Sequence, residues 1–252
     1  MNSLVFDEVA ESYDRARPSY PDALIDDLIE MAAVSSQSRI LEVGAGTGQA
    51  TRSFARRGLC LVCLEPGVRL AAIARGNLSV FPRVSLINTS FESWSVESDA
   101  FDLVVSAQAF HWVEPEVRFA KAHAALKRGG ALAILTNVPS RGQSELDRDI
   151  DACYERFAPS HQSMGAQRRT QLEPQFGSCG LFQVLPVRQY LWASSYSSGE
   201  YVELIRTYSD HHLLPEMERE ALFEGIRQVI ESRGGRLGLQ YESRLLVGKR
   251  AV

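Results

Sequence analysis

Residues 40–50 read ILEVGAGTGQA, and this stretch decides the fold class. A short apolar run ends in three glycines at alternate positions, Gly44, Gly46 and Gly48, and a helix-forming segment follows. Glycine in such a turn allows a positive φ and lets a ligand approach the backbone closely. In an open α/β sheet, this strand-to-helix turn lies at the edge where ligands bind. Taken alone, the loop would also suit a tight turn that binds nothing.

Outward from this loop, short apolar runs alternate with longer helical patterns. The runs are RILEVG, LCLVCLE, RVSLIN, FDLVVS and ALAILTN. Short buried runs that alternate with helices are typical of right-handed βαβ units and a parallel sheet. We therefore expect a doubly wound α/β layer over residues 1–138, the cofactor-binding core. The helix before the fifth run is expected to end at the Gly129–Gly130 pair, with Lys127 and Arg128 in its last turn.

The rest of the chain has a different pattern. Residues 139–235 are predicted to form helical insertions that cover the substrate, although LFQVLPVRQYLW within them suits a strand. Residues 236–252 are predicted to form the last strand. No repeat, low-complexity tract or linker divides the sequence, so we expect residues 1–252 to form a single domain.

An acidic residue, Glu65, follows the second run about 20 residues after the loop, where such a side chain accepts the hydroxyls of a ribose. A ligand that contains a nucleoside is therefore indicated, either a dinucleotide or S-adenosylmethionine. The dinucleotide fingerprint requires a small residue where this chain has Gln49, and no lysine has a tyrosine four residues before it. Glu42, at the end of the first run, suits a cationic ligand better than a pyrophosphate. These details favour S-adenosylmethionine.

Six segments in order and spacing resemble the class I S-adenosylmethionine-dependent methyltransferases. The resemblance is greatest to the small-molecule branch that includes the trans-aconitate and the ubiquinone and menaquinone methyltransferases. It implies a Rossmann-like fold with a mostly parallel seven-stranded sheet, an antiparallel last strand and a helical insertion over the active site. The segments are FDEVAESYDRARPSYP (6–21), ILEVGAGTGQATRSFARRG (40–58), LVCLEPG (61–67), TSFESW (89–94), FDLVVSAQAFHWV (101–113) and LKRGGALAILTN (126–137).

The resemblance also implies cofactor-binding residues, assigned position by position. The glycine loop would line the methionine and ribose of the cofactor, Glu65 would bind the ribose hydroxyls, and Pro66 would flank the adenine. Ser90 and Phe91 depart from the acid and small residue that the family usually has before Glu92, beside the adenine. The full set is Tyr13, Arg17, Glu42, Gly44, Ala45, Gly46, Gly48, Glu65, Pro66, Ser90, Phe91, Glu92, Ser106 and Gln108.

Composition and missing motifs limit the partners. The formal net charge is −4, so the chain has no overall basic field for a phosphate backbone. It lacks both the Asn/Asp-Pro-Pro-aromatic element of amino-directed nucleic-acid methylation and a Pro-Cys nucleophile. No apolar run is long enough for a membrane helix, and acidic residues near the start argue against a secretory signal. We expect a small-molecule acceptor, no nucleic acid, no membrane, a cytoplasmic location, and a monomer or homodimer.

Candidate residues for the acceptor side are few. His111 follows the fourth strand and is the candidate general base or substrate hydrogen-bond donor, although it would also suit a packing role beside Trp112. Arginine forks recognise carboxylates, so we expect a small acidic or hydroxylated acceptor. His211 and His212 are adjacent, a spacing that suits no common chelate on a helix, so no metal is predicted. The arginines are Arg15, Arg17, Arg141, Arg168, Arg169 and Arg206, and the nearby tyrosines are Tyr196, Tyr201 and Tyr208.

The predicted function is in-line transfer of a methyl group from S-adenosylmethionine to a small molecule. Two alternatives stay open at this point. One is an NAD(P)-dependent oxidoreductase, which the dinucleotide mismatches disfavour. The other is a protein that binds S-adenosylmethionine without catalysis and regulates a partner.

Overall fold

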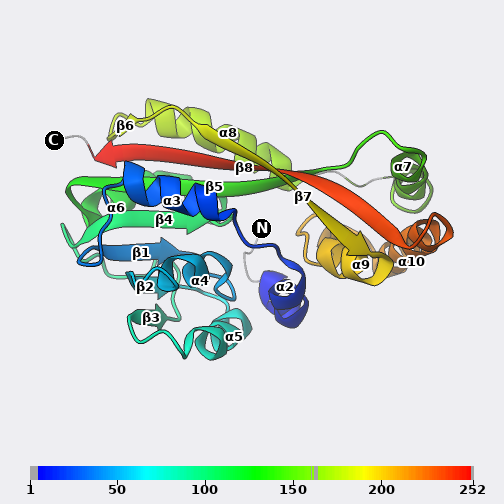
Figure 1. Cartoon of the computed structure of the whole chain (residues 1–252), viewed down its shortest axis with the longest axis horizontal. Coiled ribbons are helices and arrows are strands. Elements are labelled where there is room, and N and C mark those ends of the chain that lie inside the picture. Colours follow the sequence, from blue (N-terminus) through cyan, green and yellow to red (C-terminus); the bar gives the residue numbers. More distant parts are fainter. Residues whose placement is uncertain (1–4, 160, 162–163, 251–252) are drawn as a thin grey trace.

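The computed structural model describes residues 5–159, 161 and 164–250 (Figure 1). One sheet runs through the molecule in the strand order β3-β2-β1-β4-β5-β8-β6, and β7 also pairs with β8. The strands are β1 (Arg39–Val43), β2 (Cys60–Leu64), β3 (Val84–Ile87), β4 (Phe101–Ala107), β5 (Leu126–Ser140), β6 (Phe182–Val184), β7 (Arg188–Ser197) and β8 (Arg236–Arg250).

Helices precede, connect and follow these strands. The helices are α1 (Val5–Glu8), α2 (Ala10–Ala16), α3 (Asp22–Met31), α4 (Gln49–Ala55), α5 (Val68–Leu78), α6 (Pro115–Ala125), α7 (Glu145–Phe157), α8 (Met164–Ser178), α9 (Ser198–Arg206) and α10 (Glu216–Ser232), and the short 3₁₀ turns are η1 (Phe110–Trp112) and η2 (His211–Leu213).

The first five strands pair in parallel, as the alternating pattern predicts. Their side chains are largely buried in the centre because helices cover both faces of the sheet. On one face, Leu28 of α3 and Phe54 of α4 pack into a core cluster with β1 and β2; on the other, Phe119 of α6 and Phe176 of α8 do so with β4 and β5. Parallel pairing brings the carboxyl ends of β1, β2, β4 and β5 to the same edge.

The end of the sheet is antiparallel, which confirms the mixed sheet that the family resemblance implies. β8 pairs antiparallel with β5 on one side and with both β6 and β7 on the other. β6 and β7 share one position in the sheet, interrupted at residues 185–187, where Pro186 has no N–H to donate. Eight strands therefore fill the seven predicted positions.

The predicted end of the helix before the fifth strand is wrong. α6 ends at Ala125 instead of at the Gly129–Gly130 pair, and Leu126 already pairs with Phe101 of β4. Leu126 is fully buried, and Lys127 Nζ lies 2.8 Å from a carboxylate oxygen of Asp102. These tertiary contacts outweigh the helical propensity of the segment.

Three helices gather beyond the parallel part of the sheet. β7 and β8 extend past the parallel strands as a long ribbon, and α7, α9 and α10 gather around its far end (Figure 1). These helices share an apolar cluster that includes Ile150, Ile205 and Phe223. α2 packs against α9, so the amino-terminal segment and this helical cover meet above the edge of the sheet. Among the described residues, no helix combines the length and apolar character needed to cross a membrane.

Candidate functional site

A cavity of about 680 Å³ lies where the parallel strands end. Its walls include the last residues of three strands, Val43, Leu64 and Ala107. The amino-terminal segment and residues of α7, α9 and η2 also line it. Most of the residues predicted to bind a cofactor line this cavity, together with His111. They are Tyr13, Arg17, Glu42, Gly44, Ala45, Gly46, Glu65, Pro66, Ser90, Phe91, Glu92 and Gln108.

The glycine loop forms part of the cavity wall, and all three of its glycines have positive φ. The amides of Gly44 and Ala45 both donate to the carbonyl of Leu64, which fixes the loop to the end of β2. A Cβ on Gly44 would come within 2.4 Å of the Cβ of Ala109, whereas one on Gly46 would meet the ring of Tyr13 at 3.3 Å. Packing against Ala109 therefore requires glycine at position 44. At position 46, the absence of a side chain leaves cavity space free beside Tyr13.

Glu65 is 5% exposed, and its carboxylate hydrogen-bonds to the glycine loop. One carboxylate oxygen accepts a hydrogen bond from the Gly46 amide at 2.8 Å, and the other accepts from the Gly67 amide at 2.9 Å. Burial raises the pKa of Glu65, and the two amides oppose that rise. Each oxygen keeps a further acceptor site, so the carboxylate can still accept hydroxyl donors from a ligand.

Glu42 is a second buried carboxylate in the wall, 1% exposed. The Thr51 hydroxyl donates to its Oε2 at 2.7 Å, and the Cys63 thiol lies 3.8 Å from the same atom. Burial raises the pKa of Glu42 to about 7, against the stabilising hydrogen bonds. A carboxylate that is costly to ionise without a partner favours a cationic group in the cavity.

This pKa gives a testable pH dependence. Because folding raises the pKa of Glu42 from 4.5 to about 7, its ionisation lowers stability as pH rises through that window. Glu42→Gln should therefore raise the unfolding free energy by about 2 to 3 kcal/mol near pH 8 and by about 1 kcal/mol or less near pH 5. Chemical denaturation of the ligand-free protein measures both values.

The exposed Glu30 on α3 provides the matched control for that substitution. Glu30→Gln should change stability little at either pH. An equal gain from Glu42→Gln at the two pH values would contradict the ionisation account and indicate better packing instead.

Two of the predicted cofactor residues do not line the cavity. Ser106 is fully buried, and its hydroxyl donates to the carbonyl of Val43 at 2.7 Å, so it ties β4 to β1. Gly48 begins α4 with a φ of 96°, and a Cβ there would meet Leu78. Both residues therefore support the structure around the loop and do not face the cavity.

Gln108 lies in the cavity wall with a left-handed φ of 58°, which is unusual for a residue with a side chain. Its side-chain NH₂ donates to the carbonyl of Asn137 at 2.6 Å, whereas its Oε1 is buried and has no hydrogen-bond partner in the described part of the chain. A strained residue with an orphaned polar atom at the end of β4 is typical of a ligand contact.

The amino-terminal segment closes one side of the cavity. Tyr13 on α2 lies over the glycine loop, and the rings of Phe6 and Trp112 pack edge to face nearby. Arg17 donates to the hydroxyl of Thr207 at 2.8 Å and to its carbonyl at 2.6 Å. Arg17 therefore joins the amino-terminal segment to the helical cover.

The six candidate arginines divide into groups. Arg17 and Arg141 line the cavity. Arg15 and Arg206 instead form ion pairs with Glu203 and Glu220 at the surface, and neither lines the cavity. The side chains of Arg168 and Arg169 lie outside the described residues.

Arg141 has the contacts of a ligand-binding arginine. It pairs with Asp151, and its guanidinium carbon lies 5.6 Å from the centre of the Tyr154 ring. Its second terminal nitrogen, NH1, is buried and makes no hydrogen bond with the residues that the structure describes. A buried guanidinium N–H without an acceptor is costly.

Several cavity residues are absent from the sequence-based prediction. Asn137 is 5% exposed near the end of β5, and its position as the polar last residue of the fifth apolar run could have indicated it. Tyr154, His161 and Asp210 come from the helical cover, where no strand pattern positions them. Tyr201 and Tyr208 also line the cavity, whereas Tyr196 bonds to Tyr241 in the core of the cover.

Comparisons with known proteins match this chain to methyltransferases. Residues 41–134 match the family described as a methyltransferase domain. An uncharacterised methyltransferase of Mycobacterium tuberculosis is 36% identical over 135 residues, which cover 54% of this chain and 53% of the relative. The chain thus spans about half the length of this curated relative.

Solved structures agree at the level of the fold. A putative type II methyltransferase from Anaeromyxobacter dehalogenans aligns with a TM-score of 0.69 and 18% identity, over 92% of this chain and 97% of that one. Phosphoethanolamine N-methyltransferase 2 of Haemonchus contortus, solved with phosphomonomethylethanolamine and S-adenosylhomocysteine, aligns with a TM-score of 0.57 and 15% identity, over 98% and 58% of the two chains.

The sheet order and the glycine loop after β1 are those of the Rossmann-like methyltransferase fold. The domain match over residues 41–134, the methyltransferase relative and the solved structures together support a class I S-adenosylmethionine-dependent methyltransferase.

Proposed function

We propose that this protein transfers the methyl group of S-adenosylmethionine to a small molecule. The observation that carries the proposal is the continuous cavity, with the glycine loop, Glu42 and Glu65 among its walls together with Arg141 and the tyrosines of the helical cover. A volume of about 680 Å³ lies within the range of pockets for small ligands. One cavity therefore suits the cofactor and a modest acceptor together.

The residues present fit this cofactor. Gly46 leaves space beside Tyr13, and Glu65 offers further acceptor sites for ribose hydroxyls. The Oε1 of Gln108 accepts no hydrogen bond from any described residue. Glu42 supplies the negative charge that a cationic methionine moiety would neutralise. When bound, the cofactor supplies a methyl group that its sulfonium has already activated.

The protein's part in the reaction is then alignment and exclusion of water. The aromatic contacts of Phe6 with Tyr13 and Trp112 close the amino-terminal side of the cavity. Arg17 hydrogen-bonds to Thr207 and so holds the amino-terminal segment against the helical cover. An acceptor held between them would meet the methyl group in line with its leaving sulfur.

For the acceptor, Arg141 supports a carboxylate or hydroxyl group near Tyr154. A hydroxyl or amine acceptor must also lose a proton. His111, 7% exposed in the cavity wall, is the imidazole proposed to take it.

The test of the cofactor is calorimetry with S-adenosylhomocysteine and with NAD. We expect saturable binding of S-adenosylhomocysteine alone; preferential binding of NAD would overturn the proposal. The test of catalysis is transfer of labelled methyl from S-adenosylmethionine to a panel of small acids, phenols and amines. Binding without transfer to any member would favour the regulatory alternative.

Arg141→Met should raise KM for acidic acceptors by about tenfold or more, because a charge-assisted hydrogen bond is lost. The affinity for S-adenosylhomocysteine should stay unchanged. Arg206→Met is the matched control, since Arg206 pairs with Glu220 away from the cavity. Activity restricted to amines, and insensitive to Arg141→Met, would exclude the arginine contact.

A further inference from the structure

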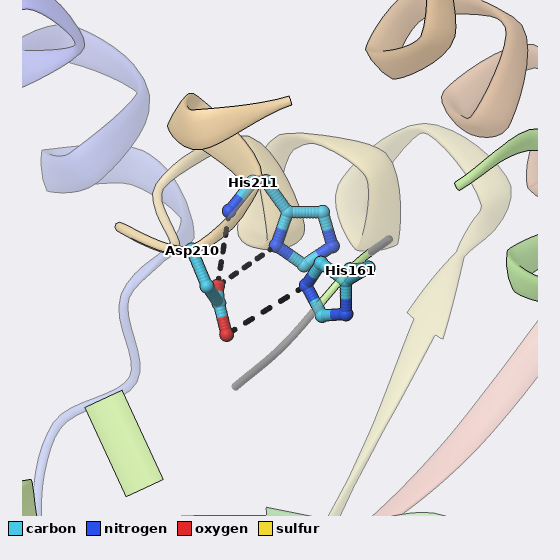
Figure 2. Close-up of side chains that lie close together, drawn as sticks. All are labelled: His161, Asp210 and His211. Atoms are coloured by element: carbon cyan, nitrogen blue, oxygen red, sulfur yellow. Dashed lines mark hydrogen bonds and ion pairs between the residues drawn. The ribbon is translucent and has the colours of Figure 1, made fainter. Parts of the chain in front are cut away.

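Three side chains of the helical cover converge in the cavity wall, away from the glycine loop. His161 follows α7, and Asp210 and His211 stand at the start of η2, about 50 residues later (Figure 2). Within the described part of the chain, they form a group of three whose potential ligand atoms all lie within 4.8 Å of one another. The adjacent histidines at 211 and 212 gave no reason to expect such a group.

The geometry is that of a preformed chelate. His211 Nδ1 lies 3.0 Å from Asp210 Oδ1, and His161 Nε2 lies 3.7 Å from Asp210 Oδ2. Ligands about 2.1 Å from a shared metal ion stand about 3.0 to 3.4 Å apart, so only a small movement of His161 is needed. Figure 2 shows both imidazole rings directed toward the one carboxylate.

The surroundings also suit an ion. His161 Nε2 is buried and makes no hydrogen bond with the described residues, and the Asp210 carboxylate at 3.7 Å is beyond hydrogen-bond distance. The other ring nitrogen of His211 lies 2.9 Å from the Tyr154 hydroxyl. A metal-ligating histidine usually donates its second N–H to such a partner, which fixes the tautomer and the ring orientation.

We propose that His161, Asp210 and His211 bind one divalent transition-metal ion. Two imidazoles and one carboxylate match the donors preferred by Zn²⁺ and its first-row neighbours, whereas Mg²⁺ and Ca²⁺ prefer oxygen ligands. His161 Nε2, His211 Nδ1 and an oxygen of Asp210 are the ligand atoms. On binding, His211 Nδ1 gives up any proton it carries, and Nε2 donates to Tyr154.

A three-ligand site leaves a coordination position free. Because all three residues line the cavity, that position can accept water or an oxygen of a second ligand. Only this last step, an acceptor oxygen on the ion, rests on the proposed methyl transfer. Ion binding itself does not depend on it.

The test is calorimetric titration of the tag-free chain, first stripped with a chelator, with Zn²⁺ and separately with Mg²⁺. We expect one Zn²⁺ per chain with a micromolar or tighter Kd, and no saturable binding of Mg²⁺. His161→Ala and Asp210→Asn should each weaken Zn²⁺ binding by more than about tenfold. Asp210→Asn keeps an oxygen for the cap it makes on the His211 amide, so the fold of η2 should survive.

His212→Ala is the matched control because His212 neighbours the group in sequence and lies outside it. It should leave Zn²⁺ binding unchanged. Absence of saturable Zn²⁺ binding, or binding that all variants retain equally, would overturn the site. Since no methyl donor is present, this result is independent of whether the methyltransferase proposal holds.

Discussion

Gly46→Val should abolish binding of S-adenosylhomocysteine while the protein still folds. Gly46 has a φ of 60°, a conformation that a β-branched residue adopts only with strain. A Cβ there would stand 3.3 Å from the ring of Tyr13, and the valine methyl groups would extend into space that belongs to the cavity. Calorimetry should show at least about a hundredfold loss of affinity, since strain and steric overlap act together.

A substitution at Gly58 tests backbone strain separately from steric overlap with the ligand. Gly58 has a φ of 73°, similar to that of Gly46, and a Cβ there would meet nothing within 4 Å. Gly58→Val therefore carries the backbone strain without obstruction of the cavity, and it should lower the melting temperature while affinity stays the same. If Gly46→Val melts normally and binds like the parent protein, the loop is only a turn.

The parallel half of the sheet is predictable from the sequence because its strands are buried on both faces. Ile40, Leu41, Leu103 and Val104 are all inaccessible to solvent, so the apolar runs are continuous and easy to recognise. The loop and the acid that follows it are equally visible, since parallel pairing forces both to one edge. Local pattern and global fold agree in this region.

The helical cover is less predictable. Several of its cavity residues lie in loops, and loops have no hydrophobic periodicity from which their path could be predicted. The approach of His161 to Asp210 therefore depends on tertiary packing. Charge alone was also a poor guide: Arg141 and Arg206 look alike in the sequence, yet only Arg141 lines the cavity. Both arginines pair with a partly exposed acid, Arg141 with Asp151 and Arg206 with Glu220, so only the path of the chain decides which of them reaches the cavity.

Glu65→Ala should weaken binding of S-adenosylhomocysteine by about 10- to 100-fold, the scale of a lost pair of charge-assisted hydrogen bonds. The structure adds a complication, because Glu65 also accepts from the Gly46 and Gly67 amides. Its removal leaves two buried donors unpaired and loosens the loop, so an affinity loss alone does not identify a ribose contact.

A second ligand resolves the two contributions. An analogue of S-adenosylhomocysteine that lacks both ribose hydroxyls should already bind the parent protein more weakly, and Glu65→Ala should then cost it little more. Such non-additivity marks a direct interaction between the carboxylate and the hydroxyls. If the substitution instead costs both ligands the same factor, Glu65 acts only through the loop, and its carboxylate would be a structural support of Gly46 instead of a ribose-binding group.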